Sequence, residues 1–216
     1  MEHVLDFFSR GGFVMYPLLL CSVLGLAIVI EKTIALRRTK VIVPEIVNVL
    51  DNIKGADDIG LAISICEKHE GSFASIIRVG LENRDWPKDE LKEALNDQGR
   101  QEVYVLERGL VILETIAGIA PLLGLLGTVV GILKVFNVIS EMGVGQASAL
   151  SGGISEALIT TIVGLSIGIP AVVVYNYFIN KAESLVLEIE KYSSVLLKKV
   201  TSFQTNSKVT ADAVQS

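Results

Sequence analysis

Three long runs of apolar residues dominate the pattern along the chain, at 13–30, 109–133 and 154–179. A membrane-spanning helix needs about 20 mainly apolar residues to cross about 30 Å of hydrocarbon. Core helices of soluble proteins rarely run this long without a charged stripe on one face. The pattern therefore predicts an all-α membrane protein with three transmembrane helices.

The second and third runs carry polar side chains at depths where such groups are costly. These residues are Glu114, Thr115 and Thr128 in the second run, and Glu156, Thr160 and Thr161 in the third. The first run holds no ionisable residue before Glu31, so we expect it to be a lipid-facing anchor. We interpret Thr128, Thr160, Thr161 and Glu156 as the lining of an ion-conducting path.

Two of the threonines are expected at one depth in the membrane. Thr128 lies about six residues before Lys134 at the end of the second run, and Thr161 about seven residues after Ile154 at the start of the third. At 1.5 Å per residue, both hydroxyls would lie about 10 Å below one membrane surface. A threonine in a membrane helix often bonds only a carbonyl of its own helix. The shared depth favours a polar constriction instead.

Small residues form a stripe on each of the same two runs. The glycines are Gly124, Gly127 and Gly131 in the second run, and Gly164 and Gly168, a GxxxG pair, in the third. Such stripes let helices approach closely. We therefore expect the second and third runs to pack tightly, against each other or against a neighbouring subunit.

The prolines and glutamates of these runs each allow two interpretations. Pro121 and Pro170 each leave one helix carbonyl without its donor, which predicts a kink or a polar backbone group facing a pore. Glu156 lies in the first turn of its run, where a helix N-terminus stabilises a carboxylate, or it serves a proton path. Glu114 lies near the other membrane surface, where we expect it to snorkel or to pair with Arg108.

Lys and Arg residues near the spans gather on one side, and such an excess marks the cytoplasm. We expect an outer N-terminal segment (1–12), a first span (13–32), a cytoplasmic helical domain (33–107), a second span (108–137), an outer loop (138–153), a third span (154–180), a cytoplasmic helical extension (181–203) and a disordered tail (204–216). From residue 88 the helical pattern continues without a clear stop into the second span. This continuity predicts one long helix at roughly 88–137.

Composition supports a membrane protein and excludes other classes. Half of the 216 residues are hydrophobic and the mean hydropathy is +0.54, which fits a small polytopic membrane protein. The net charge is −5 with no basic block, so nucleic-acid binding has no electrostatic support. Cys21 lies in the first run and Cys66 in the loop after it, so we expect no disulfide and too few ligands for a metal site. The two histidines, His3 and His69, are far apart, and we expect no cofactor. No nucleophile–base pair or phosphate loop is visible, so we expect no enzyme activity.

Two segments resemble signatures of the ExbB/TolQ/MotA proton-channel family. Residues 120–132 read Ala-Pro-Leu-Leu-Gly-Leu-Leu-Gly-Thr-Val-Val-Gly-Ile, which resembles the second-span signature. Residues 153–161 read Gly-Ile-Ser-Glu-Ala-Leu-Ile-Thr-Thr and, with 164–165 and 169–176, resemble the third-span signature. The three-span layout is most similar to ExbB and TolQ, since the flagellar stator subunit has four spans. Within the first segment, the residues Ala-Pro-Leu-Leu-Gly-Leu are more similar to ExbB than to TolQ.

The resemblance implies a homopentameric bundle around two single-span helices of an ExbD/TolR-type partner. That partner would supply a protonatable aspartate, beside Thr128 and Thr161 of this chain and a glutamate at the position of Glu156. Protons would be the transported ion. The resemblance also implies a multi-pass protein of the cell inner membrane, in contact with lipid, with a periplasmic N-terminus and a cytoplasmic C-terminus.

The implied function is to convert the proton motive force into mechanical work, energising TonB-dependent outer-membrane transport through a TonB- or TolA-like protein. A TolQ-like role in envelope integrity, a stand-alone channel or transporter, and a structural scaffold are the alternatives. Three spans without an internal repeat argue against a transporter. Co-purification discriminates, because a motor subunit should bring down a small single-span protein with one membrane aspartate.

Overall fold

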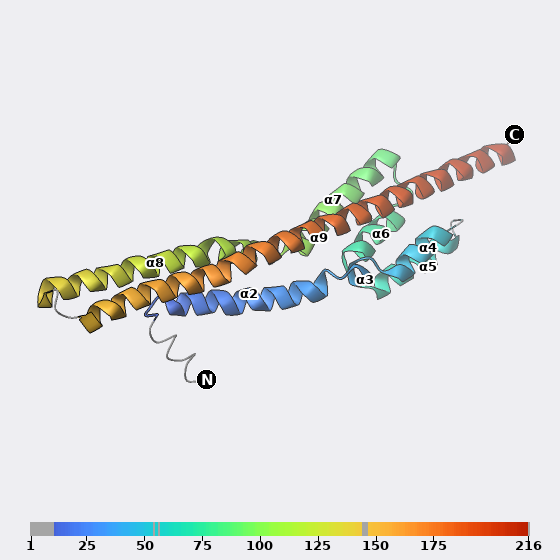
Figure 1. The fold of residues 1–216 in the computed structure, drawn as a ribbon. Helices are drawn as coiled ribbons and strands as arrows, with labels where there is room; N and C mark the ends of the chain where they lie inside the picture. Colours follow the sequence, from blue (N-terminus) through green and yellow to red (C-terminus); the bar gives the residue numbers. More distant parts are fainter. Residues whose placement is uncertain (1–10, 54, 56, 144–146, 216) are drawn as a thin grey trace. The chain divides into compact units, whose positions relative to one another are not determined.

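The computed structural model describes residues 11–215 except 54, 56 and 144–146, and it leaves out the side chains of 57, 142, 147–149 and 205–215. Within the described residues every regular element is a helix, which confirms the predicted all-α class. The helices are α2 (Met15–Ala35), α3 (Arg38–Val41), α4 (Pro44–Asn52), α5 (Asp57–Lys68), α6 (Ser72–Glu82), α7 (Lys88–Glu107), α8 (Leu110–Met142) and α9 (Ala147–Gln215) (Figure 1).

The chain divides into two compact units. The first, here called the membrane unit, comprises Met1–Lys32 and Gly109–Phe178. The second, here called the polar unit, comprises Thr33–Arg108 and Ile179–Ser216. The long helix α9 therefore contributes its first part to the membrane unit and its later part to the polar unit.

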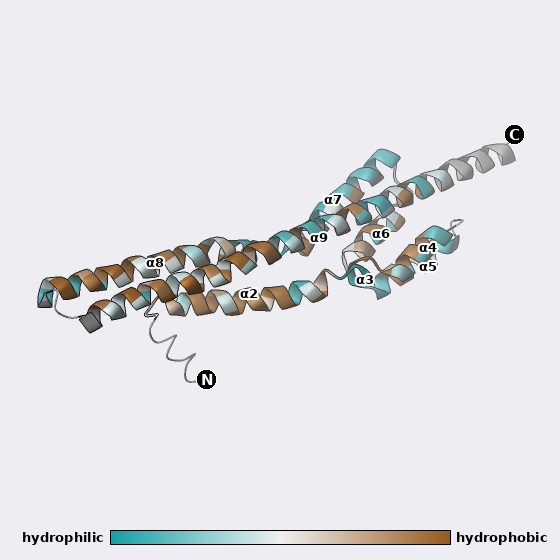
Figure 2. Cartoon of the chain, viewed as in Figure 1, coloured by the Kyte–Doolittle hydropathy of each residue, from teal (hydrophilic) through white to brown (hydrophobic). Residues whose placement is uncertain are grey.

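The membrane unit contains three helices that are long and apolar enough to cross a membrane. Figure 2 shows α2, α8 and the first part of α9 as predominantly hydrophobic. Leu18 of α2 is fully buried in a cluster with Ala120 of α8 and Ile159 of α9. Many large apolar side chains on these helices are exposed, among them Leu122 and Val173. Such exposure is costly in water and suits lipid or a neighbouring subunit.

The predicted single helix at 88–137 is wrong, because the chain breaks between α7 and α8. Helix α7 ends at Glu107, and α8 begins at Leu110 after a left-handed Gly109 with φ of +90°. L-residues with a side chain rarely adopt this conformation, whereas glycine adopts it readily. The hydrophobic pattern continues across the break, so the pattern alone conceals it.

The polar unit is built from α3 to α7 and the later part of α9. Helix α6 packs on α9: Phe73 is fully buried and contacts the ring of Tyr192 edge-on, with centroids 5.3 Å apart. A Cβ at Gly80 would overlap the side chain of Leu196, so this glycine permits the close approach. An apolar face on α6 and one on α9 thus form the core of this unit.

Polar contacts also join the short helices to α9. Arg38 Nε donates to Glu188 Oε2 at 2.9 Å. Lys199 Nζ donates to the carbonyls of Leu50 and Asp51 at 2.7 Å each, which satisfies the C-terminal end of α4. Helix α9 continues to Gln215, in contrast to the disordered tail expected from residue 204.

Candidate functional site

The hydroxyls of Thr128 and Thr161 meet between α8 and α9 in the membrane unit. Their Oγ1 atoms hydrogen-bond to each other. Thr128 Oγ1 also lies 3.3 Å from the carbonyl oxygens of Gly124 and Ala157, and Thr161 Oγ1 lies 3.2 Å from that of Gly124. The structure therefore brings together the two residues that the depth calculation pairs. The i−4 bond of Thr128 to its own helix is present as well.

Thr160 occupies a different position from its neighbour. Its side chain is fully buried, and its Oγ1 donates within its own helix, 3.1 Å from the carbonyl of Glu156 and 3.0 Å from that of Ala157. A Cβ at Gly127 would overlap this side chain. The arrangement favours a packing role for Thr160 over the predicted lining role.

The glycine stripes of α8 and α9 lie against each other within one chain. A Cβ at Gly164 would lie 2.6 Å from the carbonyl oxygen of Ala120, and one at Gly131 would lie 2.7 Å from that of Gly153. A Cβ at Gly124 would lie 2.9 Å from the Thr160 carbonyl oxygen. Real Cβ atoms essentially never approach other heavy atoms this closely. These glycines therefore let the backbones touch, and this contact sets the two hydroxyls side by side.

The two prolines lie inside the helices that carry the site. Pro121 is in α8 and Pro170 is in α9. A Cβ at Gly168 would lie 2.5 Å from Cγ of Pro121, so the proline ring packs where the second glycine of the GxxxG pair leaves room. The kinks expected at these prolines stay predictions.

Glu156 has a partner that the sequence reasoning missed. Lys134 Nζ donates to both carboxylate oxygens, at 2.6 and 2.7 Å. The Glu156 side chain is 13% exposed and that of Lys134 is 52% exposed. Gly12 lies against the same carboxylate, because a Cβ there would overlap Oε1. Helix α8, helix α9 and the segment before α2 thus converge on one ion pair.

Glu114 and Thr115 lie near the start of α8, far along the helix from the threonine pair. Thr115 Oγ1 donates to the carbonyl of Val111 in its own helix at 2.8 Å. Glu114 is exposed. Glu114 belongs to the membrane unit and Arg108 to the polar unit, and the predicted ion pair between them stays a prediction.

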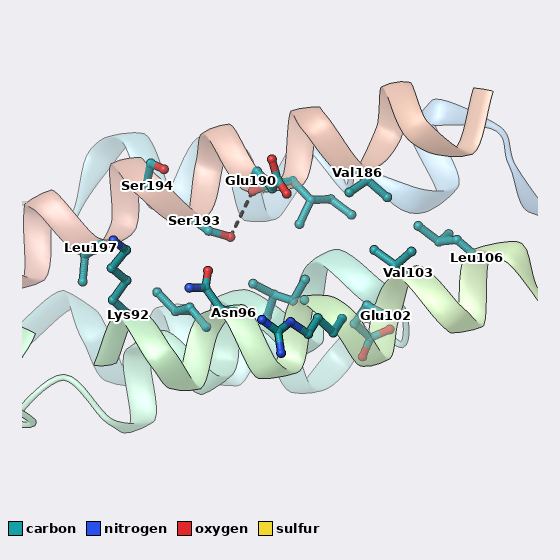
Figure 3. A pocket seen from close by; sticks show the side chains of 15 residues that line it. Lys92, Asn96, Glu102, Val103, Leu106, Val186, Glu190, Ser193, Ser194 and Leu197 are labelled. Atoms are coloured by element: carbon teal, nitrogen blue, oxygen red, sulfur yellow. Dashed lines mark hydrogen bonds between the residues drawn. The ribbon is translucent and has the colours of Figure 1, made fainter. Parts of the chain in front are cut away.

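A cavity of about 470 Å³ lies in the polar unit, mainly between α7 and α9 (Figure 3). Lys92, Asn96 and Glu102 of α7 and Glu190 and Ser193 of α9 line it, together with apolar side chains of both helices. No pattern in the sequence indicates this cavity, because its walls lie about 90 residues apart along the chain. In the part of the chain that the structure describes, no group of three His, Cys, Asp or Glu side chains could hold a metal ion.

In two exposed ion pairs of the polar unit, the cationic partner lowers the pKa of the carboxylate. The hydrogen bond from Arg38, and then its charge, lower the pKa of Glu188 below the ordinary value. His69 Nε2 lies 2.7 Å from Glu45 Oε2, and this hydrogen bond and the imidazolium charge lower the pKa of Glu45. The first pair joins α3 to α9, and the second joins α4 to the residue that follows α5. Exposed pairs of this kind contribute little to stability.

Comparison with known proteins gives consistent matches over both parts of the chain. Residues 68–191, more than half of the sequence, match the MotA/TolQ/ExbB proton channel family. The chain is 34% identical to a protein named ExbB-like 1 of Synechocystis sp. over 182 residues, 82% of this chain and 71% of that protein.

Of two further relatives, one is named ExbB and the other TolQ. The ExbB homolog of Methanothermobacter thermautotrophicus is 30% identical over 206 residues, 93% of this chain and 70% of that protein. The Tol-Pal system protein TolQ of Haemophilus influenzae is 36% identical over 107 residues, 48% of this chain and 47% of that protein. The matched region contains the threonine pair and the Lys134–Glu156 pair.

Proposed function

The chain belongs to the MotA/TolQ/ExbB proton channel family, and we propose that it converts the proton motive force into mechanical work together with an ExbD/TolR-type partner. The observation that carries this proposal is the Thr128–Thr161 hydroxyl pair between two apolar helices. Polar groups at membrane depth are costly and are retained where they serve transport. The family is one of proton channels, and catalysis of a chemical reaction forms no part of the proposal.

The proposed path needs a proton-carrying group from outside this chain. Thr128 and Thr161 are only partly buried, so one side of the pair can be reached from outside the α8–α9 contact. A partner carboxyl placed there could exchange hydrogen bonds with the two hydroxyls, which both donate and accept. Threonines cannot carry a proton charge themselves at neutral pH. We therefore assign the protonation step to an aspartate of the partner and the positioning of that aspartate to the threonines.

The proposed assembly is a homopentamer in which α8 and α9 line a lumen and α2 faces lipid. Two single-span partner helices would occupy the lumen. The exposed apolar side chains of the membrane unit support burial against lipid and neighbours. The protein is a multi-pass membrane protein. Its charge distribution supports an N-terminus outside the cytoplasm and a C-terminus within it. We place the protein in the inner membrane, which would put the N-terminus in the periplasm.

We propose an ExbB-like role, energising TonB-dependent transport across the outer membrane. Two ExbB-named relatives, which align with 82% and 93% of the chain, support this role. A TolQ-like role in envelope integrity, with a TolA-like protein, is the second candidate. Complementation of cells that lack either system separates the two roles.

The test of the proposal is purification of the full chain with its partner from native membranes in mild detergent, followed by native mass spectrometry. The expected result is five copies of this chain with copies of a small single-span protein that has one membrane aspartate. A monomer without such a protein would refute both the assembly and the motor function.

A further inference from the structure

The Lys134–Glu156 ion pair has two short hydrogen bonds and a largely buried carboxylate, unlike an ordinary surface salt bridge. One ammonium donates to both oxygens of one carboxylate, at 2.6 and 2.7 Å, and the carboxylate is largely buried. A lysine near the end of an apolar span ordinarily extends along the helix toward the interface. Here the side chain of Lys134 instead crosses from α8 to α9, so the pair determines where both charges lie.

Gly12 forms the third wall of this arrangement. Its φ is +66°, in the left-handed region, and a Cβ on it would overlap Glu156 Oε1. Two separate features thus require glycine at this position: the backbone conformation and the space occupied by the carboxylate. The segment before α2 is thereby fitted to the ion pair.

The pair lies close to the threonine site but on a different level. Lys134 is six residues beyond Thr128 on α8, and Glu156 is five residues before Thr161 on α9. At 1.5 Å per residue, these spacings correspond to about 9 Å and about 8 Å along the helices. Along α9, the Glu156 carboxylate therefore lies within about one and a half helical turns of the hydroxyl pair.

We propose that Lys134 is a positioning residue, which holds the Glu156 carboxylate in place against Gly12 at the end of the proton path. This inference rests on the proposed function and adds a residue that determines the geometry of that site. A charge at this depth without a counter-ion is unfavourable, so removing Lys134 would leave Glu156 free to turn toward water or other donors. Arginine at position 134 would preserve the counter-ion, whereas methionine would preserve only the length.

The contact itself is tested by zero-length crosslinking of the full-length complex in detergent. A carbodiimide activates the Glu156 carboxylate, and the Lys134 amine then attacks to form an amide while the carbodiimide leaves as a urea with the lost oxygen. Glycine ethyl ester is added as a competing amine. We expect the 134–156 amide to exceed the ester adduct at Glu156 by about tenfold in the wild type.

Two variants and one control make this readout specific. Gly12→Ala should lower the yield of the amide severalfold, because its Cβ displaces the carboxylate. Gly118→Ala should leave the yield unchanged, because a Cβ there meets no atom within 4 Å. The proposal would be overturned if glycine ethyl ester labels Glu156 to the same extent in the wild type and in Lys134→Met, and if the wild type forms no amide between residues 134 and 156.

The role in transport is tested in cells complemented at matched protein levels. Lys134→Met should lower proton-dependent activity by about tenfold, while Lys134→Arg should stay within about threefold of the wild type. Lys88→Met, an exposed lysine at the start of α7, is the control and should be without effect. Wild-type activity of Lys134→Met would overturn the proposal. If the wild type itself shows no proton-dependent activity, the proposed function fails, whereas the crosslink still decides where Glu156 lies.

Discussion

Replacing Gly164 by alanine should disturb the contact between α8 and α9 that sets the threonine hydroxyls together. The added Cβ would lie 2.6 Å from the Ala120 carbonyl oxygen and 2.9 Å from Gly124 Cα. Ordinary Cβ contacts begin near 3.4 Å, so the backbones must separate locally by about 0.8 Å. Both neighbouring atoms are backbone, which cannot rotate away as a flexible side chain could.

The expected cost follows from two opposing effects. Overpacking of a close contact costs about 1–3 kcal/mol. Alanine gains up to about 1 kcal/mol over glycine in a helix interior. We therefore expect Gly164→Ala to lower the free energy of unfolding by about 1–2 kcal/mol.

The assay is a reversible unfolding titration with sodium dodecyl sulfate in mixed micelles, followed by circular dichroism. Gly118→Ala is the matched control, because Gly118 is also a helix-interior glycine of the membrane unit and a Cβ there meets nothing within 4 Å. The control should be as stable as the wild type or slightly more stable. Gly164→Ala could unfold at the wild-type detergent fraction, or both variants could be destabilised equally. Either result would show that the close contact at Gly164 does not limit stability.

Three further predictions concern the polar unit. Burial raises the pKa of Cys66 from 9.0 to about 11, which lowers the thiolate fraction at pH 8 by about a hundredfold. In a Cys21→Ser background, native protein at pH 8 should therefore react with iodoacetamide up to about a hundredfold more slowly than urea-unfolded protein. Because folding raises this pKa, the thiol's contribution to stability is present below its ordinary value of 9.0 and is lost as the pH rises toward 11; equal labelling rates would contradict the burial. Lys199→Met should cost about 1 kcal/mol, measured by thermal unfolding, because it removes the ammonium that donates two hydrogen bonds to the end of α4; an unchanged melting temperature would contradict the cap. Gly99→Ala in α7 should gain about 0.5–1 kcal/mol, because a Cβ meets no neighbour there, and a loss would show that the site is occupied.

The spans and the threonine pair were predictable because membrane helices obey simple geometry. Length and hydropathy identify the spans, and a constant rise per residue places Thr128 opposite Thr161. The same arithmetic places Lys134 opposite residues 155 and 156, so a signal for the ion pair with Glu156 was present. Lys134 also marks the end of the second apolar run, and this position conceals its pairing with Glu156.

Other features depend on backbone conformation that a hydropathy pattern does not carry. The break at Gly109 depends on a positive φ, and the contact of Gly12 with Glu156 joins residues 144 positions apart. The burial of Thr160 also follows from rotation of α9 about its axis, which places Thr161 at the contact with Thr128 and its neighbour beneath Gly127. Adjacent residues on one helix point about 100° apart, so equal chemistry does not give them equal positions.

The proposed function places the Thr128–Thr161 pair on a proton path. The direct measurement is proton flux into liposomes that contain the full chain with its single-span partner, driven by a potassium diffusion potential and followed with a pH-sensitive dye. Thr128→Val with Thr161→Val should lower the flux by about tenfold at unchanged assembly, because valine keeps the shape and removes the hydroxyls. Thr115→Val, whose hydroxyl bonds only to its own helix among the contacts described, should conduct like the wild type. Wild-type flux in the double variant would show that the two hydroxyls lie off the proton path.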